Sequence, residues 1–239
     1  MHRRHPKLTF AVGILSIFFT ALLVTTAYPN CAAAETAAES AEKPGLKEEA
    51  PSVSSFTDLR NHWAEDAVTD LVRRGLIKGY PDNTFRPNER TTRVECVAIL
   101  VRVLNVKPAG EEELANLSDR NAIPLWARGA MAAAFKAGLV KGYREADGKT
   151  VFHPFAPVTR VEIAILTARL AALKTGAIQA PPAAFRDYPQ IPKWALKEID
   201  SAAARGLIKG YPDNTFRAEK EVTRAETAAM VLRLTNIIP

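Results

Sequence analysis

The sequence contains one twelve-residue segment twice, letter for letter, at Gly75 to Arg86 and again at Gly206 to Arg217. A looser copy begins at Gly138, between the other two. Each copy is preceded by a tryptophan and followed by the motif Thr-Arg-x-Glu. Recurrence of the same residues at a fixed spacing is the mark of a repeat architecture, so the chain is predicted to contain three tandem repeats.

The spacing within the copies supports this register. In every copy a tryptophan precedes a first glycine by 12 positions and a second glycine by 16. These residues are Trp63, Trp126 and Trp194, with Gly75, Gly138 and Gly206 as the first glycines and Gly79, Gly142 and Gly210 as the second. From the second glycine to the arginine of Thr-Arg-x-Glu the distance is 14 positions in the outer copies and 18 in the middle one. The four extra residues fall within residues 144–151, which predicts a longer loop between unchanged elements.

Residues 1–34 are typical of an export signal. A basic start is followed by an uncharged apolar stretch at residues 8–26 and by an Ala-x-Ala cleavage site. One alternative is a retained membrane anchor, because the apolar stretch approaches spanning length. The other is a lipoprotein site at Cys31, although the residues before it are not small.

Residues 35–55 are rich in Ala, Glu, Pro and Ser without an aromatic residue, so they are predicted to be a disordered linker.

Charge and cysteine content limit the possible partners. Removal of the signal would take away Arg3, Arg4 and Lys7 and lower the formal net charge from +6 to +3. So mild and interspersed a charge argues against a nucleic-acid partner. Cleavage before residue 35 would leave Cys96 as the one cysteine, and its place on the apolar side of a helix predicts a buried, inert thiol.

Each repeat is predicted to form a helix, a loop and a second helix. In the first helix, apolar or small residues occupy the tryptophan position and the positions 5, 8 and 9 later, a spacing that places them on one face. The tryptophan is therefore expected to pack in the core at the interface between lobes, and the first glycine stands where a left-handed C-terminal cap belongs. The second helices are expected at residues 94–104, 161–171 and 225–235.

Two short helices cannot enclose a core alone, so the repeats are expected to pack on one another. The prediction is one all-α domain, a three-pronged bundle arranged about a pseudo-threefold axis. Its repeats are residues 56–114, 115–182 and 183–239.

The loop segment Tyr-Pro-Asp-Asn-Thr-Phe has the composition of a turn. Proline fixes φ, aspartate and asparagine bond nearby backbone, and asparagine tolerates positive φ. A calcium loop is the alternative, but Asp82 and the residues after it lack alternating oxygen ligands, a glycine at the sixth position and a closing glutamate. The segment is predicted to be structural, and no metal or cofactor is expected.

The threonine and glutamate of Thr-Arg-x-Glu have a structural explanation. Threonine followed three residues later by glutamate, ahead of an apolar run, forms a capping box in which each side chain accepts from the other residue's backbone amide. The predicted pairs are Thr92 with Glu95, Thr159 with Glu162 and Thr223 with Glu226.

The arginine of the motif needs another explanation, because a positive charge at a helix N-terminus costs roughly a few tenths of a kcal/mol. The three arginines are Arg93, Arg160 and Arg224. One interpretation is a solvated side chain or an ion pair with a neighbouring lobe's Asp58, Asp119 or Asp187. The other is a fork at a groove for an anionic or hydroxyl-rich ligand, assisted by exposed amides of the helix N-terminus.

These residues, together with Phe56-x-Asp58 and His62-Trp-Ala64, resemble the S-layer homology repeat of bacterial surface proteins, which typically occurs in three tandem copies. The resemblance covers residues 56–239. It implies a three-pronged helical bundle and a non-catalytic anchor, exported to the cell wall or cell surface. Grooves between its repeats would hold secondary cell-wall polysaccharide, commonly with a pyruvylated amino-sugar end, or a peptidoglycan-linked glycan. A monomer without a membrane partner is expected once the signal is removed.

The resemblance also implies which residues bind the glycan. Arg93, Arg160 and Arg224 would bind its carboxylate. The residues that would shape or line the grooves are Asp58, Asp119 and Asp187, Trp63, Trp126 and Trp194, and Gly79, Gly142 and Gly210.

The middle repeat departs most from the family pattern. It has residues 144–152 in place of Pro-Asp-Asn-Thr-Phe, Leu117 for the phenylalanine of Phe-x-Asp, and His153 for the loop arginine. In the outer repeats, Asn83 and Asn214 occupy the turn position where the family usually has glycine.

Two other classes of protein are considered. A glycan-active hydrolase needs one asymmetric carboxylate pair with separated pKa values, whereas these acids occur in triplicate and the glutamates are committed to caps. The exported chain would also hold only His62, His153 and Cys96 as further metal ligands or bases. An S-layer lattice subunit is disfavoured by the short length, since a signal, a linker and three repeats are expected to account for the whole sequence.

Overall fold

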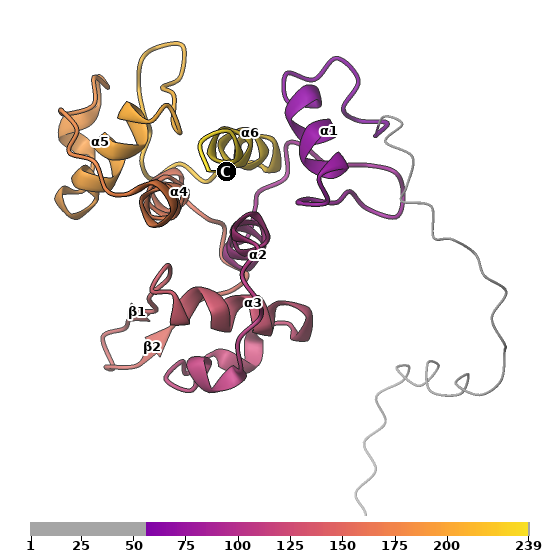
Figure 1. The fold of residues 1–239 in the computed structure, drawn as a ribbon, viewed down its shortest axis with the longest axis vertical. Helices are drawn as coiled ribbons and strands as arrows, with labels where there is room; N and C mark the ends of the chain where they lie inside the picture. The colour runs from indigo at the N-terminus through magenta and orange to yellow at the C-terminus, as the bar shows by residue number, and fades with distance from the viewer. Residues whose placement is uncertain (1–55, 239) are drawn as a thin grey trace, which may run out of the picture. The chain divides into compact units, whose positions relative to one another are not determined.

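The structure, a computed structural model, describes residues 56–238, and the regular secondary structure in this part of the chain is helical apart from one short hairpin (Figure 1). The all-α prediction is therefore confirmed. The predicted export signal at residues 1–34 and linker at residues 35–55 lie outside the described residues. None of the helices in residues 56–238 has the length and apolar character that crossing a bilayer requires.

Each repeat contributes two α-helices. The first helices are α1 (Glu65–Arg73), α3 (Leu125–Lys136) and α5 (Leu196–Ala204), and the second helices are α2 (Arg93–Leu104), α4 (Arg160–Thr175) and α6 (Arg224–Thr235). Short 3₁₀ helices occupy Glu111–Leu114, Arg120–Ala122, Tyr188–Gln190 and Lys193–Ala195. The second helices begin within one residue of the predicted positions, and α4 continues four residues beyond its predicted end.

The extra residues of the middle repeat form a small hairpin. Strands β1 (Tyr143–Arg144) and β2 (Thr150–Val151) pair in antiparallel register, with Tyr143 opposite Val151. Gly148 in the connecting turn has φ +83°, a backbone conformation that glycine adopts without strain. The insertion is thus confined to the loop, as the unchanged spacing of the flanking helices predicts.

The predicted caps are all present. Thr92, Thr159 and Thr223 are the N-caps of the second helices, and each forms a complete capping box with the glutamate three residues later. The first helices end in left-handed glycines. At Gly206, with φ +70°, the amides of Gly206 and Leu207 donate to the carbonyls of Ala203 and Ala202, which satisfies two of the terminal acceptors of α5.

The core face of each first helix starts one residue after the tryptophan. Ala64, Val68 and Leu71 are fully buried at a spacing of four and three residues, and the same spacing recurs in the other repeats. The expectation that the tryptophans pack in the core is wrong, because each lies one residue off this face. Trp63, Trp126 and Trp194 are 64%, 60% and 66% exposed.

The helices that pack together come from different repeats. The first helix α3 of the middle repeat packs against α2 of the repeat before it, α5 packs against α4, and α1 packs against α6 (Figure 1). The three second helices also contact one another, so α2, α4 and α6 form the centre, and each lobe is a first helix with its loop. No repeat buries its own apolar surface alone.

Three equivalent residues join the repeats at the centre of this arrangement. The amide of Thr91 donates to the carbonyl of Val222, that of Val222 to Val158, and that of Val158 back to Thr91, at 2.9–3.1 Å. All three are buried. These bonds form a closed ring, and the predicted pseudo-threefold axis stays a prediction.

Gly206→Ala should lower the free energy of unfolding by about 1 kcal/mol or more, because an alanine at positive φ is strained although the position has open space around it. Gly206→Asn should be milder, since asparagine tolerates this conformation. Thermal unfolding followed by circular dichroism measures both variants. An equal loss for the two would show that backbone strain is not the cause.

Candidate functional site

The arginine of each Thr-Arg-x-Glu motif is the first residue of a second helix and reaches onto the loop of another repeat. Arg93 contacts the middle repeat, Arg160 the third, and Arg224 the first. In each case the guanidinium also lies over a tyrosine ring, at 4.3, 4.6 and 5.0 Å from the ring centre. These tyrosines, Tyr143, Tyr211 and Tyr80, follow the second glycine of each repeat, and their recurrence in the sequence is a signal for this contact.

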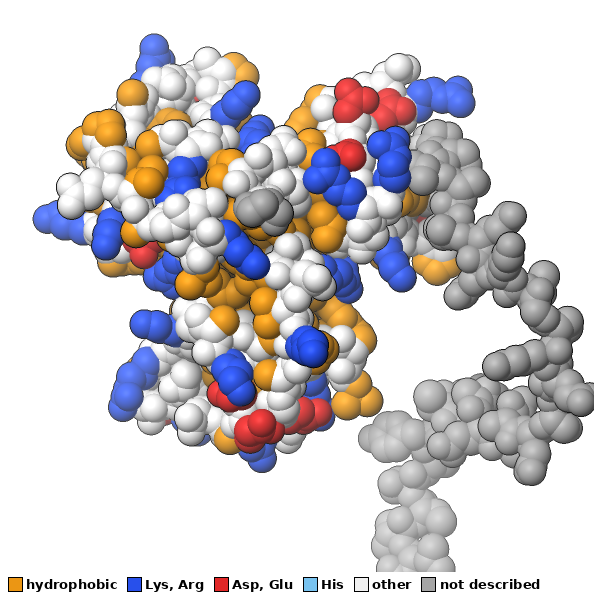
Figure 2. All heavy atoms as spheres, in the orientation of Figure 1, with side chains coloured by type: hydrophobic (Ala, Val, Ile, Leu, Met, Phe, Trp, Pro, Cys, Tyr) orange, Lys and Arg blue, Asp and Glu red, His pale blue; other side chains and the backbone are white. Residues whose placement is uncertain are grey.

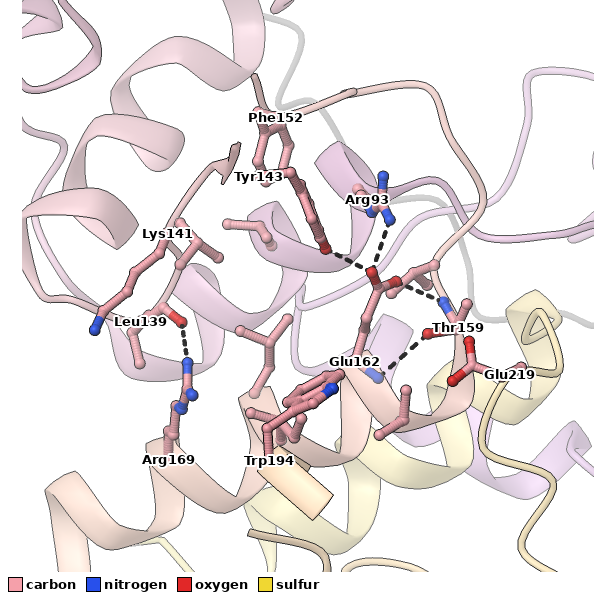
Figure 3. Close-up of a pocket in the computed structure, with 16 residues that line it drawn as sticks. Arg93, Leu139, Lys141, Tyr143, Phe152, Thr159, Glu162, Arg169, Trp194 and Glu219 are labelled. Atoms are coloured by element: carbon pink, nitrogen blue, oxygen red, sulfur yellow. Dashed lines mark hydrogen bonds and ion pairs between the residues drawn. The ribbon is translucent and has the colours of Figure 1, made fainter. Parts of the chain in front are cut away.

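Arg93 forms an ion pair with a glutamate of the next capping box. Its Nη2 lies 2.7 Å from Oε1 of Glu162, which also accepts the Tyr143 hydroxyl at 2.5 Å (Figure 3). Burial alone would raise the pKa of Glu162, but the bonds from Arg93, the Thr159 amide and Tyr143 hold this pKa below its ordinary value. Burial and the Glu162 carboxylate raise the pKa of Tyr143. The carboxylate therefore stays ionised and the phenol protonated.

Arg160 is buried, with 6% of its surface exposed. Its Nη2 donates to the backbone carbonyl of Lys209 at 2.5 Å, and its guanidinium lies over the rings of Tyr211 and Phe216. The Nε atom is buried without a partner. Such a side chain has little surface left for a ligand. Its contacts instead stabilise the packing of the middle repeat against the third.

Arg224 is partly exposed and bonds to backbone. Its Nε donates to the carbonyl of Phe85 at 2.8 Å and its Nη2 to that of Lys78 at 3.1 Å. Its guanidinium lies over the rings of Tyr80 and Phe85. These acceptors are neutral, so the positive charge of Arg224 is held in place without being cancelled.

The backbone amides beside these arginines are already occupied. The amides of Arg93 and Val94 donate to the carbonyls of Ala156 and Pro154, and the amides that begin α4 and α6 have equivalent partners. The threonine cap takes the third amide of each helix. The expectation that exposed helix-terminal amides assist an anionic ligand is therefore wrong, because these amides already have acceptors within the protein.

The aspartates bind the loop of their own repeat. Both carboxylate oxygens of Asp187 accept backbone amides, from Phe216 and Arg217, each at 2.7 Å. Asp58 and Asp119 make the same contacts in their own repeats. The interpretation that Arg93, Arg160 and Arg224 form ion pairs with these aspartates is wrong, because the aspartates hold the left-handed backbone of the loop instead.

The second glycines also have a packing role. A Cβ atom on Gly79 would overlap the ring of Phe56, and one on Gly210 would lie 3.3 Å from the ring of Phe185. The loop can therefore approach the aromatic residue of Phe-x-Asp only when this position lacks a side chain. In the middle repeat, a Cβ on Gly142 would meet Thr150 of β2 and Leu117.

Two hollows lie beside the arginines. The Arg93 hollow has a volume of about 430 Å³, and its polar lining includes Arg93, Lys141, Tyr143, Glu162, Arg169 and Glu219 (Figure 3). The Arg224 hollow has a volume of about 160 Å³, and its polar lining includes Lys78, Glu95, Arg102 and Arg224. Arg160 lines neither, and the same holds for the three aspartates and the second glycines.

An exposed tryptophan completes each hollow. Trp194 lines the Arg93 hollow and Trp126 the Arg224 hollow, whereas Trp63 lines neither. Each hollow therefore takes its arginine from one repeat, its loop from a second and its tryptophan from the third. Two further cations that are not among the predicted site residues, Lys141 and Arg169, also line the larger hollow.

Other chemistry is sparse among residues 56–238. This part of the chain contains no group of three or more His, Cys, Asp or Glu side chains that could hold a metal ion. Cys96 is buried as predicted, and burial raises the pKa of its thiol far above the ordinary value, so it stays protonated and unreactive. On the face drawn in Figure 2, the lysine and arginine side chains are scattered over the lobes instead of gathered in one patch.

The sequence profile of the S-layer homology domain matches residues 55–95, 116–164 and 184–228. Because these matches cover more than half of the sequence, the chain belongs to the S-layer homology domain family. The three matched segments coincide with the three repeats, and each one ends within a second helix.

Known proteins share this region. The chain is 32% identical to an amylopullulanase of Thermoanaerobacterium thermosulfurigenes over 75% of its own length and 9% of that protein. It is 32% identical to an S-layer protein of Bacillus licheniformis over 74% of its length and 19% of that protein. It is 33% identical to a cellulosome-anchoring protein of Acetivibrio thermocellus over 66% and 35%. The chain thus spans about a third or less of the length of these relatives. Its family membership makes it a secreted, cell-surface anchoring module.

The Glu162 ion pair should make stability depend on pH. Because the pKa of Glu162 is lowered in the folded state, its contribution is present above the ordinary value of 4.5 and lost as the pH falls below it. Unfolding by urea at several pH values should therefore show a decline in stability below about pH 4.5. The decline should be shallower in Glu162→Gln, which keeps an acceptor for the cap. An identical pH profile for the variant would contradict this account.

Arg160→Ala should lower the free energy of unfolding by about 1.5–3 kcal/mol, because it removes a charged hydrogen bond to a carbonyl of another repeat. Arg73→Ala is the control, since Arg73 is exposed on α1 and its ion pair is weak, so its effect should stay within about 0.5 kcal/mol. Denaturant unfolding measures both. Equal stability of Arg160→Ala and the parent protein would remove the structural role of Arg160.

Proposed function

We propose that this chain is a non-catalytic anchor that binds an acidic cell-wall polysaccharide, with the Arg93 and Arg224 hollows as its binding sites. The supporting observation is that each hollow combines a fixed arginine with an exposed tryptophan of another repeat. An arginine presents a rigid fork to carboxylate and hydroxyl oxygens, and a tryptophan face offers apolar surface to a sugar ring.

The exposure of the tryptophans is the strongest support for this function. Large aromatic side chains that stay exposed on a folded surface are frequent in binding sites. Trp194 and Trp126 are exposed although the helix faces beside them are fully buried. A tryptophan that served only the core would not be placed one residue off the core face in all three repeats.

Family membership points to the same partner class. The relatives include an S-layer protein and a cellulosome-anchoring protein, which are proteins of the cell surface. The expected ligand is a secondary cell-wall polysaccharide, with a pyruvylated sugar as the acidic group. A hydrogen bond to a charged group contributes about 1.5–3 kcal/mol, so one hollow alone would bind weakly and two hollows on one polymer would add avidity.

The carboxylates are poor candidates for glycoside cleavage. The aspartates of the three repeats are committed to loop amides, and the glutamates of the capping boxes accept from their own N-cap residues. A glycosidase needs an acid with a raised pKa opposite an ionised partner. The pKa values of Glu162 and Glu226 are instead both lowered, since bonds from Arg93 and Tyr211 outweigh burial.

Trp194→Ala should weaken binding to isolated cell walls by about 2 kcal/mol or more, because it removes the aromatic face of the Arg93 hollow. Trp63→Ala is the matched control, since Trp63 is equally exposed but lines neither hollow. Co-sedimentation with cell walls measures both variants, and circular dichroism checks their folding. Equal binding by the two variants would refute the proposed site.

Incubation of the protein with purified wall polysaccharide should release no reducing sugar, while the protein binds it with a fixed stoichiometry. Steady release of reducing ends would identify an enzyme. Ordered sheets formed by the protein alone, seen by electron microscopy, would identify a lattice subunit.

A further inference from the structure

The two hollows are built from equivalent residues. Lys78 in the Arg224 hollow corresponds to Lys141 in the Arg93 hollow, and Arg102 corresponds to Arg169. The glutamates of the first two capping boxes, Glu95 and Glu162, line one hollow each. The two hollows differ in how these charges are paired.

The charges of the Arg93 hollow are largely cancelled within the protein. Arg93 pairs with Glu162 at 2.7 Å, and Arg169 pairs with Glu198 at 3.4 Å. Two opposite charges are left on the lining, those of Lys141 and Glu219. The formal charge of this hollow together with Glu198 is therefore zero.

The charges of the Arg224 hollow are not cancelled. Its lining has three cations, Lys78, Arg102 and Arg224, and one carboxylate, Glu95, a formal excess of two positive charges. Among the described residues, none of the three cations lies within ion-pair distance of a carboxylate. The two arginines donate to backbone carbonyls instead.

At the motif arginine, the contrast goes together with a different tyrosine contact. In the Arg93 hollow, Tyr143 bonds to the same carboxylate oxygen as Arg93 and so helps to hold the ion pair together. In the first repeat the equivalent Tyr80 donates to Glu89 at 3.3 Å, outside the capping box. Glu95 keeps only its cap contacts, and no carboxylate is held against Arg224.

We propose that the acidic group of the wall glycan binds in the Arg224 hollow, and that the Arg93 hollow binds an uncharged, hydroxyl-bearing part of the polymer. This inference rests on the proposed function. An anion gains most where cations are fixed and unpaired, whereas in the Arg93 hollow it would have to displace Glu162 from Arg93.

The sizes of the hollows fit this division. The Arg93 hollow, at about 430 Å³, lies in the usual range for small-molecule sites of about 300–1,000 Å³ and has room for sugar rings beside Trp194. The Arg224 hollow, at about 160 Å³, suits a single compact group such as a carboxylate on the end of a sugar. With two subsites on one module, a single polymer would bind through its acidic group in the Arg224 hollow and through an uncharged sugar in the Arg93 hollow.

The test compares two equivalent lysines, Lys78→Gln and Lys141→Gln. Both side chains are exposed, so neither change should disturb the fold. Binding is measured by titration calorimetry to native wall polysaccharide and to the same polymer after its carboxylates have been reduced to alcohols. The quantity of interest is the ratio of the two dissociation constants, which reports the preference for the acid.

The parent protein should prefer the native polymer. Lys78→Gln should lower this preference by up to about fivefold, as expected for one exposed charge, and Arg224→Gln should lower it by about tenfold or more. Lys141→Gln and Arg93→Gln should leave the ratio unchanged. Circular dichroism and thermal unfolding confirm that each variant is folded.

Three outcomes would overturn the inference or its basis. A loss of the preference in Lys141→Gln or Arg93→Gln, with Lys78→Gln unaffected, would place the acid in the other hollow. Equal binding of both polymers by the parent protein would refute the charge readout but leave the anchor function standing. No binding of either polymer would refute the proposed function itself.

Discussion

A closed ring of backbone hydrogen bonds between Thr91, Val158 and Val222 is the contact on which the rest of the structure depends. Each of these residues lies immediately before the N-cap of a second helix, so the ring sets the positions at which α2, α4 and α6 begin. The first two amides of each helix then find acceptors in the loop of another repeat. A buried helix end without such partners would cost several unsatisfied hydrogen bonds, so the three repeats stabilise one another as a set.

The candidate binding sites are a consequence of this exchange. Because every second helix starts against the loop of another repeat, its first side chain, an arginine, is carried to the seam between lobes. A tryptophan one residue off the core face of the remaining repeat reaches the same place in two of the three seams. The three equivalent arginines differ in their contacts and therefore in their roles. Arg160 is buried and joins two repeats, Arg93 forms an ion pair, and Arg224 is held by backbone carbonyls without a carboxylate partner among the described residues.

Much of the local structure could be predicted from the sequence. The capping boxes, the left-handed glycines and the left-handed Asn83 and Asn214 follow from side-chain chemistry within a few residues, so their spacing is sufficient to identify them. The predicted position of the tryptophans in the core is wrong, because a helical periodicity does not say which residue begins the buried face, and a shift of one position turns a side chain by about 100°. The role of the aspartates is not visible in a local sequence pattern, because their carboxylates accept from amides 27 to 34 residues away.

The sequence by itself determined that the protein has three repeats, that each consists of two capped helices around a turn, and that it belongs with surface anchors of the S-layer homology type. Those properties depend on side-chain chemistry within a few residues and on the spacing of recurring motifs, both of which the sequence contains directly. Only the tertiary structure decided which helices pack together, which carboxylate faces which arginine, and which seam stays open and positively charged. These depend on contacts between repeats, where three nearly identical motifs meet different neighbours.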